Sequence, residues 1–229
     1  MAKSNISIII VAGGNGMRMG HKTPKQFLLL SGIPILIRTL TTFASALPNS
    51  EKVIVLPSKH IALWKNLCKK HNCDIQHTII EGGKSRTCSV RNGLSCIEHK
   101  DGVVLIHDAV RPLATKTLLT NVLHAAEKYN AAIPVIDITD SLRKIEAEES
   151  HAVEREQYKA VQTPQGFNLE LIRKAYHNAK EKEFTDDAAL LESIGVKIAL
   201  VDGEKTNIKI TTPEDMVIAR SILKKQIKI

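Results

Sequence analysis

The sequence predicts an α/β fold, with a mostly parallel, twisted sheet covered by helices on both faces. Short apolar runs rich in β-branched residues recur along the chain, and helical patterns lie between most of them. No internal repeat or low-complexity tract interrupts this order. Strands that alternate with helices in this way build parallel sheets buried on both faces, so the order of the elements indicates the fold class.

The expected strands are the apolar runs at 6–11, 53–56, 103–106, 131–135 and 197–201. The expected helices are at 33–45, 61–71, 85–98, 116–129, 169–181, 186–194 and 213–225. Thr212 and Pro213 provide the cap and the first turn of the last helix. Ligands of such sheets bind beyond the carboxyl ends of the strands, so the residues that follow each strand are the candidates for a site.

The stretch from about 138 to 162 does not fit the alternation. Between 141 and 161, two polar segments flank an acidic tip at 146–150, a pattern that predicts two strands joined by a turn. A two-stranded hairpin cannot build a core of its own. We therefore expect a single domain over residues 1–229 with a projecting β-arm that buries itself across a homodimer; a solvated surface hairpin is the alternative.

The composition places the chain outside the secretory and membrane classes. A chain of 229 residues can bury a substantial core without disulfides or structural metals. Its four cysteines form no Cys-x-x-Cys pair, and Cys68, His71 and Cys73 lie too close together for an ordinary zinc half-site, so we expect reduced thiols. The apolar stretch near the N-terminus is too short for a signal peptide or a membrane span. We expect a cytoplasmic protein.

The net charge of +8 raises the question of a nucleic-acid partner. Lysine and arginine are spread along the chain, and aromatic residues, which stack on single-stranded bases, make up only 3% of it. Excess positive charge also steers polyanionic substrates into an enzyme site. We therefore expect small anionic substrates and no nucleic acid. A nucleotide- or nucleic-acid-binding module without turnover is the alternative.

A glycine loop follows the first expected strand directly. Gly13, Gly14 and Gly16 allow backbone N–H groups to approach phosphate oxygens, and Arg18 and Lys25 add two cations. The loop lacks the third glycine and later acidic residue of a dinucleotide fingerprint, and the Gly-Lys-Ser/Thr ending of a P-loop. The hypothesis is chemistry on a nucleoside triphosphate; a turn whose glycines serve only geometry is the alternative.

Candidate site residues also lie at the end of the expected strand at 103–106 and at the glycine turn at 82–83. Asp108 follows the strand at 103–106, where its carboxylate can hold Mg²⁺ against phosphate oxygens or contact a ribose, with Arg111 as a nearby cation. The glycine turn at 82–83 enters a helix on which Arg86 and Ser89 share a face, so its backbone can read a base edge. The alternative for both positions is a simple turn and helix cap.

The last part of the chain adds one cation and two carboxylates. Lys209 is expected on a short strand just before a helix, a good place to hold a second anion. Thr185 is expected to cap the helix at 186–194, and Asp186 and Asp187 are interpreted as cap residues only.

Six short motifs occur in order over nearly the whole chain: Gly14-x-Gly16-x-Arg18-Met19, Pro24-Lys25-Gln26, His107-Asp108-Ala109-x-Arg111-Pro112, Thr163-Pro164-Gln165, Thr185-Asp186 and Asn207-Ile208-Lys209. Together they closely resemble the methylerythritol phosphate cytidylyltransferase family of non-mevalonate isoprenoid synthesis. Each motif alone is weak, but six in order are specific. The resemblance implies a Rossmann-like nucleotidyltransferase fold, a homodimer joined by the β-arm, and CTP with Mg²⁺. The implied products are 4-diphosphocytidyl-2-C-methyl-D-erythritol and pyrophosphate.

The resemblance also implies roles for single residues. Arg18 and Lys25 would stabilise the pentacoordinate α-phosphate, while Arg155, reaching into the partner's site, and Lys209 would position the methylerythritol phosphate. The residues around the nucleotide would be Ala12, Gly13, Gly14, Gly16, Gly83, Arg86, Ser89, Asp108 and Ala109, with Asp108 serving the metal or the ribose. The residues around the second substrate would be Arg111, Ser141, Arg155, Thr185 and Lys209. Ser141 stands where the family commonly has threonine, so the hydroxyl remains but is less constrained.

The expected chemistry needs cations rather than a general base. The second pKa of a phosphate monoester is about 6, so its attacking oxygen is already largely anionic at pH 7. The obstacle is repulsion between two anionic reactants, which arginine, lysine and Mg²⁺ reduce by binding the transition state best. The nine histidines are therefore interpreted as structural or surface residues. A ribitol 5-phosphate cytidylyltransferase shares several of these motifs and is the nearest alternative.

Overall fold

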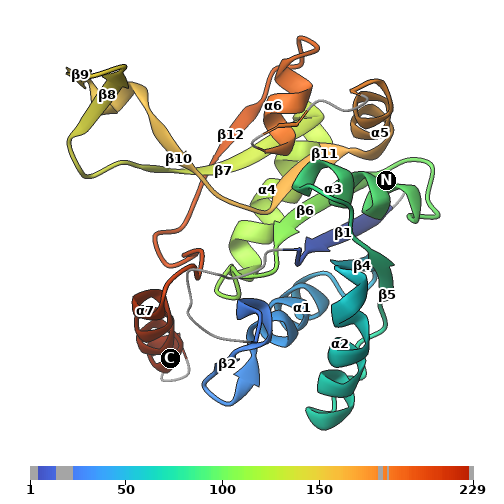
Figure 1. Ribbon diagram of the computed structural model, residues 1–229. Helices are drawn as coiled ribbons and strands as arrows, with labels where there is room; N and C mark the ends of the chain where they lie inside the picture. Colours follow the sequence, from blue (N-terminus) through green and yellow to red (C-terminus); the bar gives the residue numbers. More distant parts are fainter. Residues whose placement is uncertain (1–4, 14–22, 180–182, 185, 227–229) are drawn as a thin grey trace.

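The computed structural model describes residues 5–13, 23–179, 183–184 and 186–226, and an eight-stranded sheet forms its centre (Figure 1). The strands are β1 (Ile6–Val11), β4 (Glu51–Leu56), β5 (Thr78–Glu81), β6 (Val103–Asp108), β7 (Ala131–Asp137), β10 (Lys159–Val161), β11 (Gln165–Asn168) and β12 (Ala199–Asp202). Their order is β10-β7-β11-β6-β1-β4-β5, with β12 paired to β7. All pairs are parallel except those made by β10 and β11, which confirms the mostly parallel sheet.

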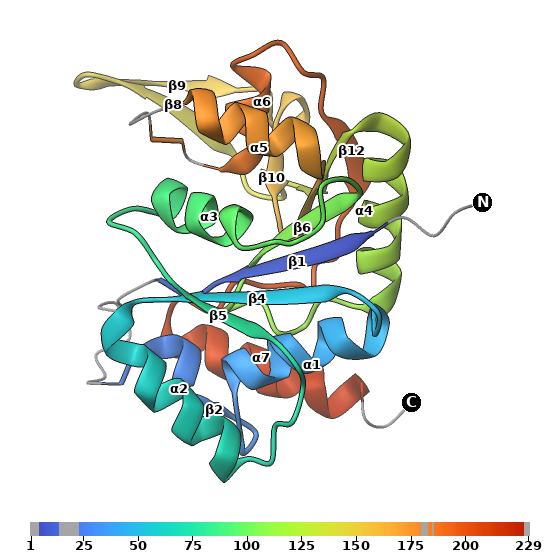
Figure 2. The same cartoon turned by 90° about the vertical axis from the view of Figure 1, so that its right-hand side faces the viewer.

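Helices cover both faces of the sheet (Figure 2). One face carries α1 (Ile35–Ala46), α2 (Ser58–Lys70) and α4 (Lys116–Tyr129), and the other carries α3 (Arg86–Ser95), α5 (Leu169–Asn178) and α6 (Asp187–Glu192). Side chains alternate along β1, so Ile8 and Ile10 join the first core and Ile9 joins the second. α7 (Pro213–Gln226) packs on a third cluster that includes Leu30 and Val110. No helix in the described ranges is long and apolar enough to cross a bilayer.

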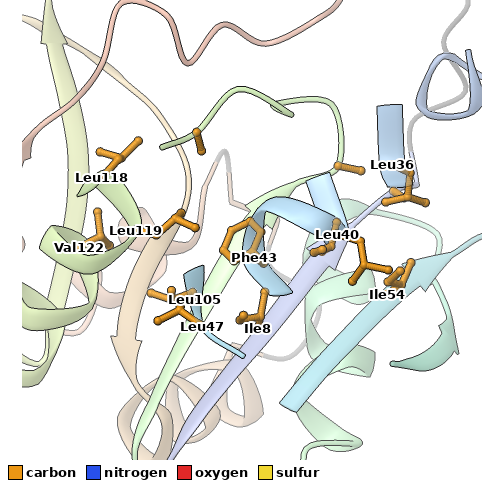
Figure 3. Close-up of a cluster of buried hydrophobic side chains, with 14 of the residues drawn as sticks. Ile8, Leu36, Leu40, Phe43, Leu47, Ile54, Leu105, Leu118, Leu119 and Val122 are labelled. Atoms are coloured by element: carbon orange, nitrogen blue, oxygen red, sulfur yellow. The ribbon is translucent and has the colours of Figure 1, made fainter. Parts of the chain in front are cut away.

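The core beneath α1 holds the central strands in place (Figure 3). Leu40 and Phe43 of α1 pack with Ile8 of β1 and Leu105 of β6, and all four side chains are fully buried. Burying each such side chain contributes about 1.5–3 kcal/mol. Because β1 and β6 are packed in this way on both faces, their carboxyl ends form a rigid base for the loops that follow them.

Two strands of the sheet were not predicted from the sequence. β11 reads Gln-Gly-Phe-Asn, a composition poor in strand formers, and it is a strand because it is enclosed between β6 and β7. β5 lies at the sheet edge, paired on one side with β4. The helix expected at 33–45 also begins later, at Ile35, because Ile33–Pro34 pairs with Leu29–Leu30 as a small hairpin, β3 with β2.

The arm is a hairpin of β8 (Leu142–Glu146) and β9 (Glu149–Val153), which extends away from the sheet (Figure 1). Within the described chain these strands pair with each other alone, and Ile145 is 69% exposed. The expectation that the second strand runs on to residue 161 was wrong. The chain turns at Arg155–Gln157, and β10 then pairs with β7. This pairing satisfies backbone N–H and C=O groups at the end of β7.

Candidate active site

The carboxyl ends of β1 and β6 open into a cavity of about 340 Å³. Its lining comes from these strand ends, from the 3₁₀ turn η2 (Lys25–Phe27), from the turn before α3 and from Lys209. The lining residues are Val11, Ala12, Gly13, Lys25, Gln26, Pro57, Gly82, Gly83, Lys84, Ser85, Arg86, Ser89, Asp108, Ala109, Val110 and Lys209. The structure therefore brings together Ala12, Gly13, Lys25, Gly83, Arg86, Ser89, Asp108, Ala109 and Lys209 from the predicted site.

The parallel register of β1 and β6 explains why their ends meet. Val11 stands opposite Asp108, and the Ala109 N–H donates to the Val11 carbonyl at 3.1 Å. The Ala12 N–H donates to the Val55 carbonyl of β4 at 2.9 Å, so the start of the glycine loop is fixed as well. Parallel strands present their carboxyl ends at one edge, and the site lies there as expected.

Asp108 is the negative centre of a cluster of cations. Its Oδ2 lies 3.0 Å from Lys209 Nζ and 3.4 Å from Arg111 Nε. Burial alone would raise the pKa of Asp108, but the positive charges of Lys209, Arg86 and Arg111 outweigh burial and hold that pKa at about 2. The carboxylate is therefore ionised at neutral pH. Asp108 is not a helix cap, since α4 is capped by the Thr115 side chain.

Lys209 lies in a segment that forms no strand, so its expected position on a strand was wrong. Two anchors fix this segment instead. The Ile210 N–H donates to the Val110 carbonyl at 2.9 Å, and buried Asn207 donates through Nδ2 to the Thr163 carbonyl at 2.9 Å. These single hydrogen bonds hold the segment where a β-strand would be held by a ladder of backbone hydrogen bonds. They bring Lys209 to Asp108 across about 100 residues of sequence.

The turn at 82–89 is closed by its serines. Ser89 Oγ accepts from the Gly83 N–H at 3.1 Å and donates to the Ser85 carbonyl at 2.8 Å, while the Ser85 side chain caps α3 by accepting from the Cys88 N–H. A Cβ at position 83 would lie 2.3 Å from the Cys88 Cβ, so only glycine fits there. Gly83 is exposed and lines the cavity, while its N–H is already held by Ser89.

The Pro-Lys-Gln motif is tied to β1 by Gln26. This side chain is 1% exposed, and its Nε2 donates to the Ala12 carbonyl at 2.8 Å. Next to it, Phe27 packs against Trp64 of α2 with ring centroids 6.5 Å apart. Lys25 is therefore held at the cavity wall by the two buried residues that follow it. Gln26 was not among the predicted site residues, although the motif itself contained the signal.

Arg86 meets a partner that the sequence prediction misjudged. Its guanidinium forms a bidentate ion pair with Asp187, at 2.9 and 2.6 Å, and Tyr176 Oη donates to the same carboxylate at 2.5 Å. Asp187 is fully buried, so its interpretation as a cap residue was wrong. The cap of α6 is Asp186, which accepts from the Ala189 N–H, so the expectation of Thr185 as the cap was also wrong. Asp187 is the first residue of α6, and it lies on the side of that helix that is buried.

Arg111 lies behind the cavity wall. Its Nη1 donates to the Asn207 carbonyl at 2.7 Å and its Nε contacts Asp108, and 11% of the side chain is exposed. Arg155 and Ser141 lie elsewhere, at the base of the arm. Arg155 donates to the Thr139 carbonyl and lines a separate cavity of about 460 Å³, and Ser141 is exposed. Neither is brought to Asp108 within one chain. Gly14, Gly16, Arg18 and Thr185 lie outside the described residues.

His107 is fully buried beside the site and plays a structural part. One ring nitrogen lies 3.0 Å from the Arg111 carbonyl, the other lies 3.1 Å from Thr163 Oγ1, and the ring packs edge-on against Phe43. Burial lowers its pKa to about 4, against a small opposing effect of the Arg111 carbonyl. The imidazole is therefore neutral at pH 7, as expected for a histidine that takes no part in proton transfer.

This buried histidine makes stability depend on pH. The unfolded chain takes up the proton at a pKa of about 6.5 and the folded chain only at about 4, so stability falls as the pH drops through that window. We expect the wild type to lose about 3 kcal/mol from this group between pH 7 and pH 4. Urea unfolding at each pH measures the loss. His107→Asn should be less stable than the wild type at pH 7, but it should lack the part of the acid-induced loss that His107 causes. The same loss of stability between pH 7 and pH 4 in the variant would contradict His107 as its source.

The donor set around Asp108 fits Mg²⁺ bound together with a phosphate ligand. Within the described residues, no group of three or more His, Cys, Asp or Glu side chains could hold a metal by itself. Mg²⁺ in phosphate-handling enzymes takes one or two carboxylates and completes its shell with phosphate oxygens and water. Asp108 offers one such carboxylate, ionised, and its ion pairs with described residues are both on Oδ2.

A family model described as 2-C-methyl-D-erythritol 4-phosphate cytidylyltransferase matches residues 6–225. The chain belongs to this family. The protein of that name from Bacteroides thetaiotaomicron is 42% identical over 217 residues, 95% of this chain and 99% of the relative. The solved structure of the Thermus thermophilus protein of that name has a TM-score of 0.80 at 34% identity, covering 96% of this chain and 99% of the other. The 4-diphosphocytidyl-2C-methyl-D-erythritol synthase of Anaerococcus prevotii gives 0.83 at 30% identity, covering 96% of each chain.

The comparisons confirm the family that the six motifs indicated. They also confirm the Rossmann-like nucleotidyltransferase fold and the class of enzyme. The relatives and the family model bear the methylerythritol phosphate name, which favours this activity over the ribitol 5-phosphate alternative and over a binding module without turnover.

Proposed function

We propose that the cavity around Asp108 joins CTP and 2-C-methyl-D-erythritol 4-phosphate to give 4-diphosphocytidyl-2-C-methyl-D-erythritol and pyrophosphate. The observation that carries this proposal is the placement of Lys25 and Lys209 in one cavity with an ionised aspartate, next to a glycine turn with exposed backbone. Family membership supports the reaction and both substrates. We place the reaction in the cytoplasm, the compartment in which free cysteines such as these four are common.

The nucleotide would lie along the strand ends, with its base on the turn at 82–89. Gly83 and Ser89 line the cavity there, and Ala12, Gly13 and Ala109 line the neighbouring wall. Backbone N–H and C=O groups can distinguish the amino and carbonyl edge of cytosine by hydrogen bonds. Gly14 and Gly16 would continue this contact along the triphosphate. Arg86 would form the floor, because Asp187 already holds its guanidinium.

The residues around the triphosphate supply positive charge where negative charge develops. Lys25 and Arg18 would stabilise the α-phosphate during transfer, and Lys209 would orient the incoming phosphate monoester. Bound Mg²⁺, held by Asp108 and phosphate oxygens, would neutralise further charge on the triphosphate. The monoester is already anionic at pH 7, so no side chain has to remove a proton. Asp108 would also keep Lys209 fixed, through their 3.0 Å ion pair, until substrate binds.

A direct assay tests the proposed reaction against its nearest alternative. Purified protein is given CTP and Mg²⁺ with either 2-C-methyl-D-erythritol 4-phosphate or ribitol 5-phosphate, and pyrophosphate release is followed. We expect rapid release of pyrophosphate with 2-C-methyl-D-erythritol 4-phosphate but not with ribitol 5-phosphate. This release should be lost when Mg²⁺ is removed by chelation. Preferential release with ribitol 5-phosphate would overturn the substrate assignment, and full activity without a divalent cation would overturn the metal.

We further propose that a homodimer completes the site through the arm. Arg155 and Ser141 lie at the arm base, away from the Asp108 cavity of their own chain, and the hairpin is mostly exposed. A two-stranded hairpin of this kind needs a surface to cover it. A partner's Arg155 and Ser141 would then join Arg111, Thr185 and Lys209 around the methylerythritol phosphate, since a two-fold dimer exchanges the same surface in both directions.

Mixing two inactive variants tests this arrangement. Lys25→Ala and Arg155→Ala should each be nearly inactive, because one loses transfer and the other loses acceptor binding. In a mixed dimer, one of the two sites combines an intact Lys25 with an intact partner arginine. Refolding the two variants together makes about half of the dimers mixed, so roughly a quarter of wild-type activity should return. A mixture no more active than either variant alone would contradict a shared site.

A further inference from the structure

The end of α2 brings two cysteines into contact. The Cys73 N–H donates to the Cys68 carbonyl at 2.9 Å, the Asn72 N–H donates to the Lys69 carbonyl at 3.3 Å, and Asn72 has a φ of 49°. These features define a Schellman motif, in which the helix ends with one left-handed residue. The motif sets the side chains of Cys68 and Cys73 against each other, and an apolar pair normally occupies these two positions.

The two thiols are close, partly buried and reachable. The Schellman motif sets one against the other, and both pack against the core on the α1 side. Both also line an open cavity of about 590 Å³ beside α2, large enough to admit a small molecule. The neighbouring Cys68 thiol lowers the pKa of Cys73 to about 7, against the opposing effect of burial. Cys73 is therefore the more readily ionised thiol of the two.

We propose that Cys68 and Cys73 form a reversible intramolecular disulfide with a small-molecule disulfide as the oxidant. The backbone hydrogen bond from Cys73 to Cys68 already fixes the two residues side by side at the helix end, which is the arrangement a disulfide between them requires. Cys88 and Cys96, also free, lie on α3 and at its end and belong to no such motif. The pair is thus a modification site separate from the Asp108 cavity.

The chemistry balances as two thiol–disulfide exchanges. The Cys73 thiolate attacks one sulfur of the small disulfide, forms a mixed disulfide and expels one thiolate. Cys68 then loses its proton to solvent and attacks the Cys73 sulfur, which forms the intramolecular bond and expels the second thiolate. Two protein thiols are oxidised, and one small disulfide is reduced to two thiols. A dithiol reductant reverses both steps.

The test uses the full chain with oxidised glutathione at pH 7, followed by trypsin digestion under conditions that block thiols. We expect the peptide Asn66–Lys69 linked to the peptide His71–Lys84, and loss of the link after reduction. A thiol with a pKa of about 7 attacks roughly three-fold faster at pH 7 than one of about 8.5, once its lower nucleophilicity is included. Cys68 and Cys73 should therefore disappear together and before Cys88 and Cys96.

Two variants separate pairing from general reactivity. The double variant Cys88→Ser, Cys96→Ser should keep the link, whereas Cys68→Ser should stop at a stable glutathione adduct on Cys73. The proposal would be overturned by a stable adduct on Cys73 in the unaltered chain, by links to Cys88 or Cys96, or by oxidation of those two cysteines first. The wild-type digest decides the matter even if a variant fails to fold.

Discussion

Replacing Lys25 by alanine is expected to lower kcat by about 10²–10³-fold while changing the Kd of CTP by only a few-fold. Lys25 lies at the cavity wall on a 3₁₀ turn that Gln26 and Phe27 anchor, so its ammonium has a fixed position. A fixed charge acts most strongly where charge develops, which is at the α-phosphate during transfer. Steady-state kinetics give kcat, and calorimetry gives the Kd of CTP.

A matched lysine separates this effect from overall charge. Lys65 is exposed on the outer side of α2, and Lys65→Ala removes the same charge from the protein. It should leave kcat unchanged and alter substrate capture slightly, in a salt-dependent way. Equal losses of kcat and CTP binding in Lys25→Ala would mean that the lysine is only a ground-state anchor.

Replacing Asp187 by asparagine is expected to have the largest effect on stability. The carboxylate is fully buried, and it accepts two bonds from Arg86 and one from Tyr176. Its loss leaves the Arg86 charge without compensation, and removing one member of a buried pair costs about 3–5 kcal/mol. Arg86 is 28% exposed, so the lower end of that range applies. For a chain of this size, Tm should fall by about 10 °C, measured by calorimetry.

Two companion variants identify the source of this loss. Tyr176→Phe removes one hydrogen bond to the same carboxylate and should cost about 1 kcal/mol. Replacing both charged partners, Arg86→Met with Asp187→Leu, should recover part of the stability lost in Asp187→Asn, because no charge is then left unpaired. A double variant that is as unstable as the sum of its single changes would contradict the ion pair as the cause.

The sequence predicted those site residues that lie at strand ends. Asp108 follows a strongly apolar run and Ala12 follows another, and parallel pairing of the two runs places both at one edge. Gly83 was found in the same way, because a glycine turn that enters a helix is a local signal. These predictions succeeded because each depends on a few neighbouring residues and on the general geometry of parallel sheets.

The contacts that the sequence did not predict join distant segments of the chain. Arg86 and Asp187 are separated by 101 positions, and nothing near either one indicates that they meet. Asp187 follows Asp186, so a local interpretation assigns both to the helix cap, and only the packing of α6 on α5 turns one of them inward. Lys209 reaches Asp108 through single hydrogen bonds instead of a strand ladder, and such bonds have no periodic pattern.

The central claim is that fixed positive groups around the phosphorus drive the transfer, without a protein base. A crystal structure of the chain with CTP and Mg²⁺ tests it most directly. We expect α-phosphate oxygens within about 4 Å of Lys25 Nζ and of the Arg18 guanidinium, with the metal beside Asp108 and the cytosine on the turn at 82–89. A triphosphate bound away from Lys25 and Arg18 would contradict the account.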